Sequence, residues 1–217
     1  MVLGGQVIGR RDFIKTTSSL VLLLATPTDS LKEQEKKRYA MLIDSSRCYG
    51  CMACVVTCAA ENNVPIGFFR TWVERFVKPT GAVIFVPKQC NHCEDPPCVR
   101  PCPTRATFRD PNGLVLIDDN LCIGCGACVQ ACPYGARFPN PVKGTADKCT
   151  FCYHRLNKGL LPACVETCPT GARIFGSLTE ENELKNIVES VPTQVLKPHA
   201  NTRPMIFYMN LPEEANR

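Results

Sequence analysis

The sequence predicts an α+β fold of two interleaved, loop-rich lobes with short strands and helices. Three observations lead to this expectation. Prolines (18) and glycines (14) are numerous, which favours many fixed turns. The 16 cysteines fall into four groups of four. A phrase of Cys-Pro, a turn and a short strand-like end occurs at 102–108, 132–138 and 168–174, which indicates an internal repeat.

Residues 1–29 are expected to form an export leader. Arg10 and Arg11 are followed, beyond Lys15, by an apolar stretch that includes residues 20–24. Paired arginines ahead of a short apolar run are typical of a twin-arginine signal, and this run is shorter than the ~20 residues that span a bilayer. The alternative is an ordinary first helix with two surface arginines, and without an Ala-x-Ala site the leader could stay attached. Because this route exports folded proteins, metal clusters could be inserted before export, so a periplasmic location or the outer face of the cytoplasmic membrane is expected.

The spacing inside each cysteine group indicates iron–sulphur clusters. The groups are Cys48, Cys51, Cys54 and Cys58; Cys90, Cys93, Cys98 and Cys102; Cys122, Cys125, Cys128 and Cys132; and Cys149, Cys152, Cys164 and Cys168. The first and third groups keep the C-x2-C-x2-C-x3-C spacing of bacterial ferredoxins, in which three thiolates hold one cubane and the fourth reaches the second cluster. Gly50, Gly124 and Gly126 let the backbone approach the cluster sulphurs. The cysteines therefore predict four 4Fe-4S clusters.

The clusters of each lobe are expected to exchange a ligand, as the two clusters of a ferredoxin do. The four resulting sets, named here by their first cysteine, are the Cys48 set (Cys48, Cys51, Cys54 and Cys168), the Cys149 set (Cys149, Cys152, Cys164 and Cys58), the Cys90 set (Cys90, Cys93, Cys98 and Cys132) and the Cys122 set (Cys122, Cys125, Cys128 and Cys102). The first two sets belong to an outer lobe, about 38–75 plus 145–180, and the last two to an inner lobe, about 83–142. Four oxidised clusters would turn the formal charge of +5 into about −3, so the basic composition does not indicate nucleic-acid binding.

Other uses of the cysteines fit the spacing less well. Zinc favours separated Cys-x2-Cys pairs, often with histidine, and cysteines this close in tight loops are badly placed to form disulfides. A Rieske centre needs two histidines. His92 and His154 lie beside groups that already have four cysteines, so hydrogen-bonding or packing roles are expected, and His199 is far from any group. A purely structural metal-binding module stays open until iron and sulphide are counted.

The segments between the cysteine groups belong to one predicted domain, 30–217. A turn at 110–113 is expected before a strand at 114–117, because Asn-Gly is a strong turn signal. Residues 64–87 contain aromatic side chains and an apolar run. They predict a hairpin or a loop insertion that covers a cluster or meets a partner, with core packing as the alternative.

The C-terminal part is expected to begin with a helix. Ser177 and Glu180 have the spacing of a capping box, which predicts a helix that ends at about Ser190. The strap, 181–217, includes the apolar run 205–209 and is expected to lie over the body of the domain.

The order of the four groups resembles that of the iron–sulphur subunits of molybdopterin oxidoreductases of the dimethyl sulphoxide reductase family. The residues at 146–152, 154–156 and 159–164 look most like those of tetrathionate and polysulphide reductase B subunits. One departure is Ala59, which stands where proline follows the last cysteine of the other groups. The resemblance implies a molybdenum or tungsten catalytic subunit and an integral, quinol-linked membrane subunit as partners. This chain would lie between them and contact the membrane only through a partner.

The expected function is electron transfer by a non-catalytic subunit, in support of the reduction of a sulphur oxyanion or polysulphide. A soluble polyferredoxin that serves several enzymes is the alternative. Four basic residues lie close in sequence to the ligands: Arg47, Lys88, Arg105 and Lys148. They are expected to raise the potentials of nearby clusters, because positive charge favours the more negative reduced form. The alternative is that they are solvated surface charges.

Overall fold

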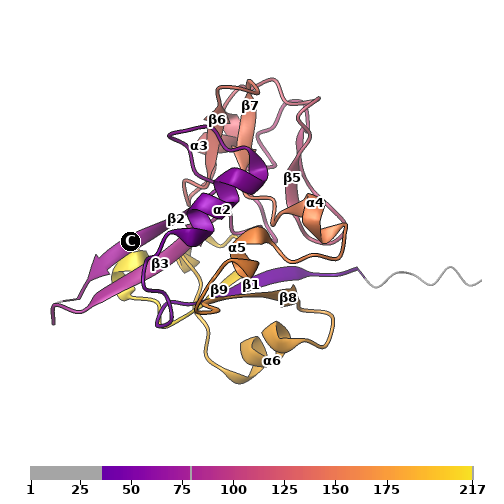
Figure 1. Cartoon of the computed structure of the whole chain (residues 1–217). Helices are drawn as coiled ribbons and strands as arrows, with labels where there is room; N and C mark the ends of the chain where they lie inside the picture. Colours follow the sequence, from indigo (N-terminus) through magenta and orange to yellow (C-terminus); the bar gives the residue numbers. More distant parts are fainter. Residues whose placement is uncertain (1–35, 79, 217) are drawn as a thin grey trace, which may run out of the picture. The chain divides into compact units, whose positions relative to one another are not determined.

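The computed structural model describes residues 36–78 and 80–216, and the compact unit that contains them begins at Lys36. The predicted export leader therefore lies outside the described residues. Within them, short helices and four small sheets are joined by long loops, which confirms the α+β class (Figure 1). None of the helices in this part of the chain is long and apolar enough to cross a membrane.

The largest sheet has three strands in the order β8-β1-β9. The central strand β1 (Tyr39–Asp44) pairs antiparallel with β8 (Arg173–Ser177) and parallel with β9 (Ile206–Met209). All of β1 after Tyr39 is buried, as expected for an apolar strand covered on both faces. One face of β1 packs against helix α6, and the other face forms part of the main core that surrounds the cysteines.

Helix α6 (Glu183–Ser190) ends where predicted but begins later than the capping box indicated. Its N-cap is Asn182, whose side chain accepts a hydrogen bond from the backbone N–H of Lys185 at 3.1 Å. Ser177 instead ends strand β8, where it pairs with Tyr39 and its Oγ accepts from the N–H of Thr179. The capping-box prediction was therefore wrong, because the sheet holds Ser177 in an extended conformation.

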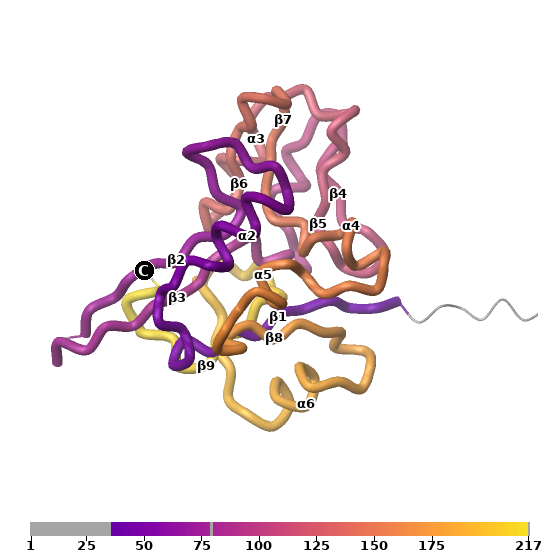
Figure 2. Tube along the Cα trace, in the orientation of Figure 1, coloured from indigo at the N-terminus to yellow at the C-terminus, as the bar shows by residue number. Residues whose placement is uncertain are grey.

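Strands β2 (Thr71–Val77) and β3 (Val83–Gln89) form the hairpin predicted within 64–87. Its base, at the Thr71–Gln89 pair, is buried beside the cysteine loops, while Val77 and Val83 at its far end are exposed. Figure 1 and Figure 2 show the hairpin extending away from the sheets that hold β5 and β7. The hairpin thus covers cysteine loops at one end and exposes two valines near the other.

The cysteine loops lie between very short elements. Two further sheets pair β4 (Thr107–Arg109) with β5 (Val115–Ile117), and β6 (Arg137–Asn140) with β7 (Thr145–Lys148). The helices are α2 (Ala53–Asn62), α3 (Ala127–Gln130), α4 (Tyr153–Leu156) and α5 (Ala163–Glu166), and the tail has single 3-10 turns at Pro198–Ala200 and Glu213–Asn216. Strand β5 confirms the strand expected at 114–117, and the turn before it closes through the N–H of Gly113 on the carbonyl of Asp110 at 3.1 Å.

The C-terminal tail crosses the cysteine loops before it enters the sheet. The N–H of Met205 donates to the carbonyl of Asn91 at 2.9 Å, and the hydroxyls of Thr202 and Tyr134 lie 2.5 Å apart. Strand β9 then adds to the edge of β1. The tail therefore links the loop around Cys90 to the main sheet.

Candidate cluster-binding site

Three cavities are each lined by all four cysteines of one predicted set. The first is lined by the Cys48 set, the second by the Cys90 set and the third by the Cys149 set. In each case the fourth cysteine comes from a distant part of the chain: Cys168, Cys132 and Cys58 respectively. The folding thus brings these three cysteines into the cavities lined by the sets to which ligand exchange assigned them.

The Cys122 set is assembled less completely. Cys122 and Cys128 share a small apolar cluster with Val99 and Val115, and the N–H of Ala146 donates to Cys122 Sγ at 3.5 Å. Cys125 is exposed on the loop between them. The contacts of Cys102 with Val99 and Thr104 lie within its own turn. Its assignment to this set therefore rests on the sequence pattern.

The chemistry of the donors fits a cluster bound through thiolates. All sixteen cysteines lie within the described residues and none is in a disulfide. Burial raises the pKa of Cys58 and of Cys93 to about 12 each, and raises the pKa of Cys149 well above its ordinary value. Such thiols stay protonated in a dry environment unless a metal replaces the proton. Iron would therefore release protons from these sets on binding.

Two Cys-Pro-Thr turns supply hydrogen bonds to sulphur. Although burial raises the pKa of Cys168, the Thr170 hydroxyl and the backbone N–H groups of Thr170 and Ala172 lower it on balance. Cys102 has the same pattern with Thr104, and its pKa is also lowered despite burial. Donors aimed at sulphur favour the thiolate and would tune a bound cluster.

Gly124 is required by the geometry of the Cys122 loop. Its φ is +67°, and an added Cβ would lie 2.3 Å from the carbonyl oxygen of Gly144, which is backbone that cannot move aside easily. Gly126 in the same loop has φ +74° but nothing within 4 Å of the added Cβ. Alanine substitutions at the two glycines therefore distinguish the free-energy cost of a positive φ from the cost of a steric clash.

We expect Gly124→Ala to prevent the Cys122 loop from closing, with loss of one cluster. The left-handed conformation costs alanine about 1–2 kcal/mol at either position, so Gly126→Ala should retain all its clusters and be only slightly less stable. Iron content and unfolding midpoints of the two variants, measured side by side, check this. Equal loss of iron from both would show that strain alone is responsible.

Of the four basic residues expected near the clusters, three are exposed or paired with a carboxylate and one is fully buried. Arg47 and Arg105 are exposed, and Lys88 is paired with Glu74 at 2.7 Å. Lys148 alone of the four is fully buried. Sequence reasoning missed three other buried cations: Arg70, Arg137 and Arg173. The last two end the repeated Gly-Ala-Arg phrase after Cys-Pro, and the first copy of the phrase has Thr107 at that position.

The histidines take the expected hydrogen-bonding and packing roles. His92 is fully buried, its Nδ1 accepts from the N–H of Val115 at 3.0 Å, and its ring stacks on Phe151 at 3.9 Å between centroids. His154 Nε2 lies 2.7 Å from Glu61. Neither replaces a cysteine in the sets described above.

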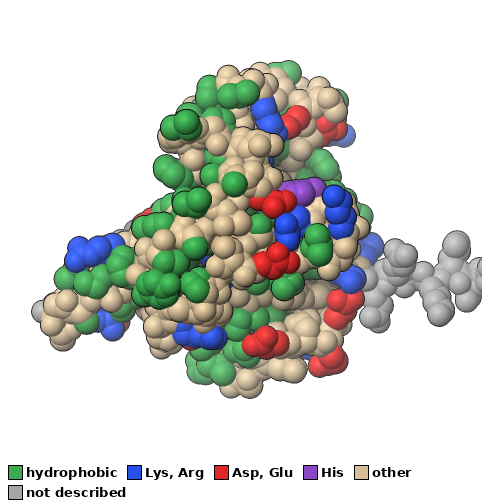
Figure 3. Space-filling view, in the orientation of Figure 1, with side chains coloured by type: hydrophobic (Ala, Val, Ile, Leu, Met, Phe, Trp, Pro, Cys, Tyr) green, Lys and Arg blue, Asp and Glu red, His purple; other side chains and the backbone are tan. Residues whose placement is uncertain are grey.

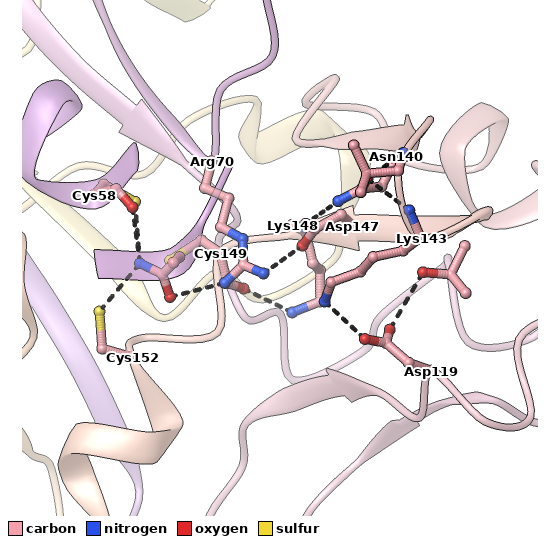
Figure 4. Close-up of polar contacts among 12 residues, drawn as sticks. Cys58, Arg70, Asp119, Asn140, Lys143, Asp147, Lys148, Cys149 and Cys152 are labelled. Carbon is pink, nitrogen blue, oxygen red and sulfur yellow. Dashed lines mark hydrogen bonds and ion pairs between the residues drawn. The ribbon is translucent and has the colours of Figure 1, made fainter. Parts of the chain in front are cut away.

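A polar network connects the Cys149 set to the sheet of β6 and β7 (Figure 4). The Asn62 amide nitrogen lies 3.6 Å from Cys58 Sγ and 3.8 Å from Cys152 Sγ. Its carbonyl oxygen accepts from Arg70 at 2.9 Å, and Arg70 in turn pairs with Asp147 at 2.7 Å. Asn62 therefore presents a donor to two ligand sulphurs of one set.

Comparison with known proteins places the chain in a family. A model of the 4Fe-4S dicluster domain matches residues 81–178. The B subunit of tetrathionate reductase from Archaeoglobus fulgidus is 56% identical over 180 residues, which cover 83% of this chain and 86% of that protein. This chain therefore belongs to the iron–sulphur B-subunit family. Other members are the B subunit of tetrathionate reductase from Salmonella typhimurium, 48% identical over 81% of this chain and 74% of that protein, and the B chain of polysulfide reductase from Wolinella succinogenes, 39% identical over 79% and 93%. The resemblance noted in the sequence is confirmed.

Proposed function

We propose that this B-subunit family member is the electron-transfer subunit of a larger oxidoreductase and relays electrons through four 4Fe-4S clusters. The observation that carries the proposal is the assembly of three complete cysteine sets around three cavities. When bound, the clusters supply one-electron chemistry. The chain's own residues hold the clusters in place, exclude water and fix the charges around them.

The contacts between sets support a linear order. Arg173 lies between Cys54 of the Cys48 set and Cys164 of the Cys149 set. Lys148 Nζ donates to the carbonyls of Cys149 and of Val115, and Val115 lines the cavity of the Cys90 set, so the Cys149 and Cys90 sets are neighbours. Cys98 of the Cys90 set and Cys128 of the Cys122 set belong to one apolar cluster. The order is therefore Cys48 set, Cys149 set, Cys90 set and Cys122 set, with one ferredoxin-like lobe at each end.

Each end set has one exposed cysteine, whereas the cysteines of the two middle sets are buried except for the half-buried Cys132. Cys51 and Cys125 are the exposed cysteines, one in each end set. Each is flanked by exposed apolar side chains: Tyr49 and Met52 near the first, Leu121 and Ile123 near the second. Figure 3 shows hydrophobic side chains gathered on the face that carries the hairpin of β2 and β3. Apolar surface around an exposed redox centre suits a partner that must approach closely.

The proposed partners follow from the family and the two ends. One end would meet a large molybdopterin catalytic subunit, and the other a quinol-linked membrane subunit. Relatives include a thiosulfate reductase electron transfer subunit from Salmonella typhi, 48% identical over 157 residues, beside the tetrathionate and polysulfide proteins. Reduction of a sulphur compound by the catalytic partner is thus the best-supported use of the electrons. The twin-arginine pattern supports work outside the cytoplasm, after export in the folded state.

An anaerobic pull-down of the full chain from its native membranes tests this function. We expect a large molybdenum or tungsten subunit and a membrane subunit to co-purify, and the complex to reduce tetrathionate, thiosulfate or polysulphide. Recovery of the chain alone with its clusters intact would contradict the fixed complex and favour a free polyferredoxin.

The exchange of ligands between sets can be tested by electron paramagnetic resonance. Cys168→Ala should remove the same signal as Cys51→Ala, because both residues line the cavity of the Cys48 set. Cys152→Ala, in the Cys149 set, is the matched comparison. If Cys168→Ala removes the signal that Cys152→Ala removes, the ligands are not exchanged.

A further inference from the structure

Three cations are buried among the cysteine sets without a carboxylate partner. Arg173, Arg137 and Lys148 expose 3%, 4% and 1% of their surface, and no Asp or Glu of the described residues forms an ion pair with them. Arg70, which is also buried, has Asp147 at 2.7 Å. Because a buried charge without a counter-charge is strongly unfavourable, the three cations require negative charge from another source.

Arg173 bridges the Cys48 and Cys149 sets. Its Nη2 lies 3.5 Å from Cys54 Sγ and its Nη1 lies 3.8 Å from Cys164 Sγ. The remaining donors meet neutral groups, the Gln89 side-chain oxygen at 2.7 Å and the Thr71 hydroxyl at 2.9 Å. These neutral partners fix the guanidinium in place and leave the sulphurs as its counter-charge.

Arg137 holds the equivalent position between the Cys90 and Cys122 sets. Its Nη1 donates to the Thr107 hydroxyl at 3.1 Å, whereas Nε and Nη2 are buried and have no hydrogen-bond partner among the described residues. Although burial lowers the pKa of Arg137, the nearby Cys98, Cys90 and Cys128 raise it on balance. Arg137 lines the cavity of the Cys90 set, and its strand β6 packs against helix α3, which carries Cys128, so the guanidinium lies between the two sets.

Lys148 lies at the remaining junction, between the Cys149 and Cys90 sets. Its Nζ donates to the backbone carbonyls of Cys149, at 2.8 Å, and of Val115. Burial and the nearby Arg137 lower the pKa of Lys148 on balance, although Cys90 and Cys149 act in the opposite direction. Figure 4 shows the hydrogen bond from Lys148 to the Cys149 carbonyl.

We propose that Arg173, Lys148 and Arg137 are fixed positive charges placed one at each of the three junctions between successive clusters. This inference rests on the proposed electron-relay function. Each cation stabilises the reduced, more negative state of both neighbours, which raises both potentials and weakens the repulsion between two reduced clusters. Arginine remains charged at all relevant pH values, so this contribution at the two intra-lobe junctions does not vary with pH.

The test is a mediated redox titration of the complex, followed by electron paramagnetic resonance, for Arg173→Gln and Arg137→Gln. We expect Arg173→Gln to make reduction of the Cys48-set and Cys149-set clusters about tenfold less favourable, equal to ~59 mV for a one-electron step, and to leave the other two unchanged. Arg137→Gln should shift the Cys90-set and Cys122-set clusters instead. Signals are assigned with single ligand variants such as Cys51→Ala.

Two controls separate charge from structure. Arg173→Lys keeps the charge and should restore most of the potential. Arg47→Gln removes an exposed charge next to Cys48 and should shift nothing. If Arg173→Gln fails to retain its clusters, the proposal is tested with Arg137→Gln in the same titration, by the potentials of the Cys90-set and Cys122-set clusters. Unchanged potentials in a variant that keeps its clusters, or an equal shift of all four clusters, would overturn the proposal.

Failure of this proposal is distinguishable from failure of the relay. The titration uses chemical mediators and reads each cluster directly, so it does not depend on which partner supplies the electrons. Four clusters with unchanged potentials would remove the cation proposal and leave the relay intact. Fewer than four clusters in the unaltered chain would contradict the relay itself.

Discussion

Cys164→Ala is expected to reduce electron flow through the complex to background while the chain stays bound to its partners. Cys164 is a buried cysteine that lines the cavity of the Cys149 set, which is second in the proposed order. With that cluster lost, the Cys48 set is separated from the Cys90 set, and no other set lies between them in the proposed order. The variant should lack about four irons per chain.

The measurement is quinol-driven reduction of the terminal acceptor by the purified complex, together with its iron content. Val165→Ala is the matched control, because it alters the same short helix α5 beside the ligand without removing a sulphur. Undiminished turnover in Cys164→Ala with four irons missing would show that electrons do not pass through the Cys149 set.

Asp147→Asn is expected to destabilise the folded chain by about 3–5 kcal/mol, the usual cost of leaving one partner of a buried ion pair uncompensated. Arg70 Nη2 lies 2.7 Å from Asp147 Oδ1, with side-chain exposures of 9% and 6%. Asp147 also accepts from the Asn140 amide at 3.0 Å. The pair joins the segment before β2 to strand β7 (Figure 4). Because Arg70 also donates to Asn62, loss of the pair should loosen the contact of Asn62 with the sulphurs of Cys58 and Cys152.

Guanidinium unfolding midpoints of the cluster-loaded chain check this prediction. The control is Lys143→Met, which removes an exposed pair with Asp119 and should cost less than about 1 kcal/mol. Arg70→Met combined with Asp147→Leu should recover much of the loss, since no charge is then buried. A loss from Asp147→Asn no larger than that of Lys143→Met would mean that water or another group compensates Arg70.

The site was more predictable from the sequence than the contacts that surround it. Cysteine spacing is local, and ligand exchange was expected from the ferredoxin spacing, so the membership of the Cys48, Cys90 and Cys149 sets could be stated in advance. The strand at 114–117 and the hairpin within 64–87 also carried strong local signals. These parts needed no knowledge of tertiary packing.

The remaining features depend on contacts between distant residues. Ser177 matches a capping box locally, but pairing with Tyr39 holds it in a strand. The parallel pairing of β9 with β1 joins residues far apart in sequence and has no local pattern. Arg137 and Arg173 look like ordinary surface arginines until the fold buries them, although their shared place in the repeat was a usable signal.

The number of clusters is the central claim, and iron and acid-labile sulphide per chain test it most directly. The anaerobically purified full chain should contain about 16 irons and about 16 sulphides, four of each for every cubane, and should show four reducible clusters on stepwise reduction. About 8 irons, as two cubanes would give, would contradict the four-cluster relay.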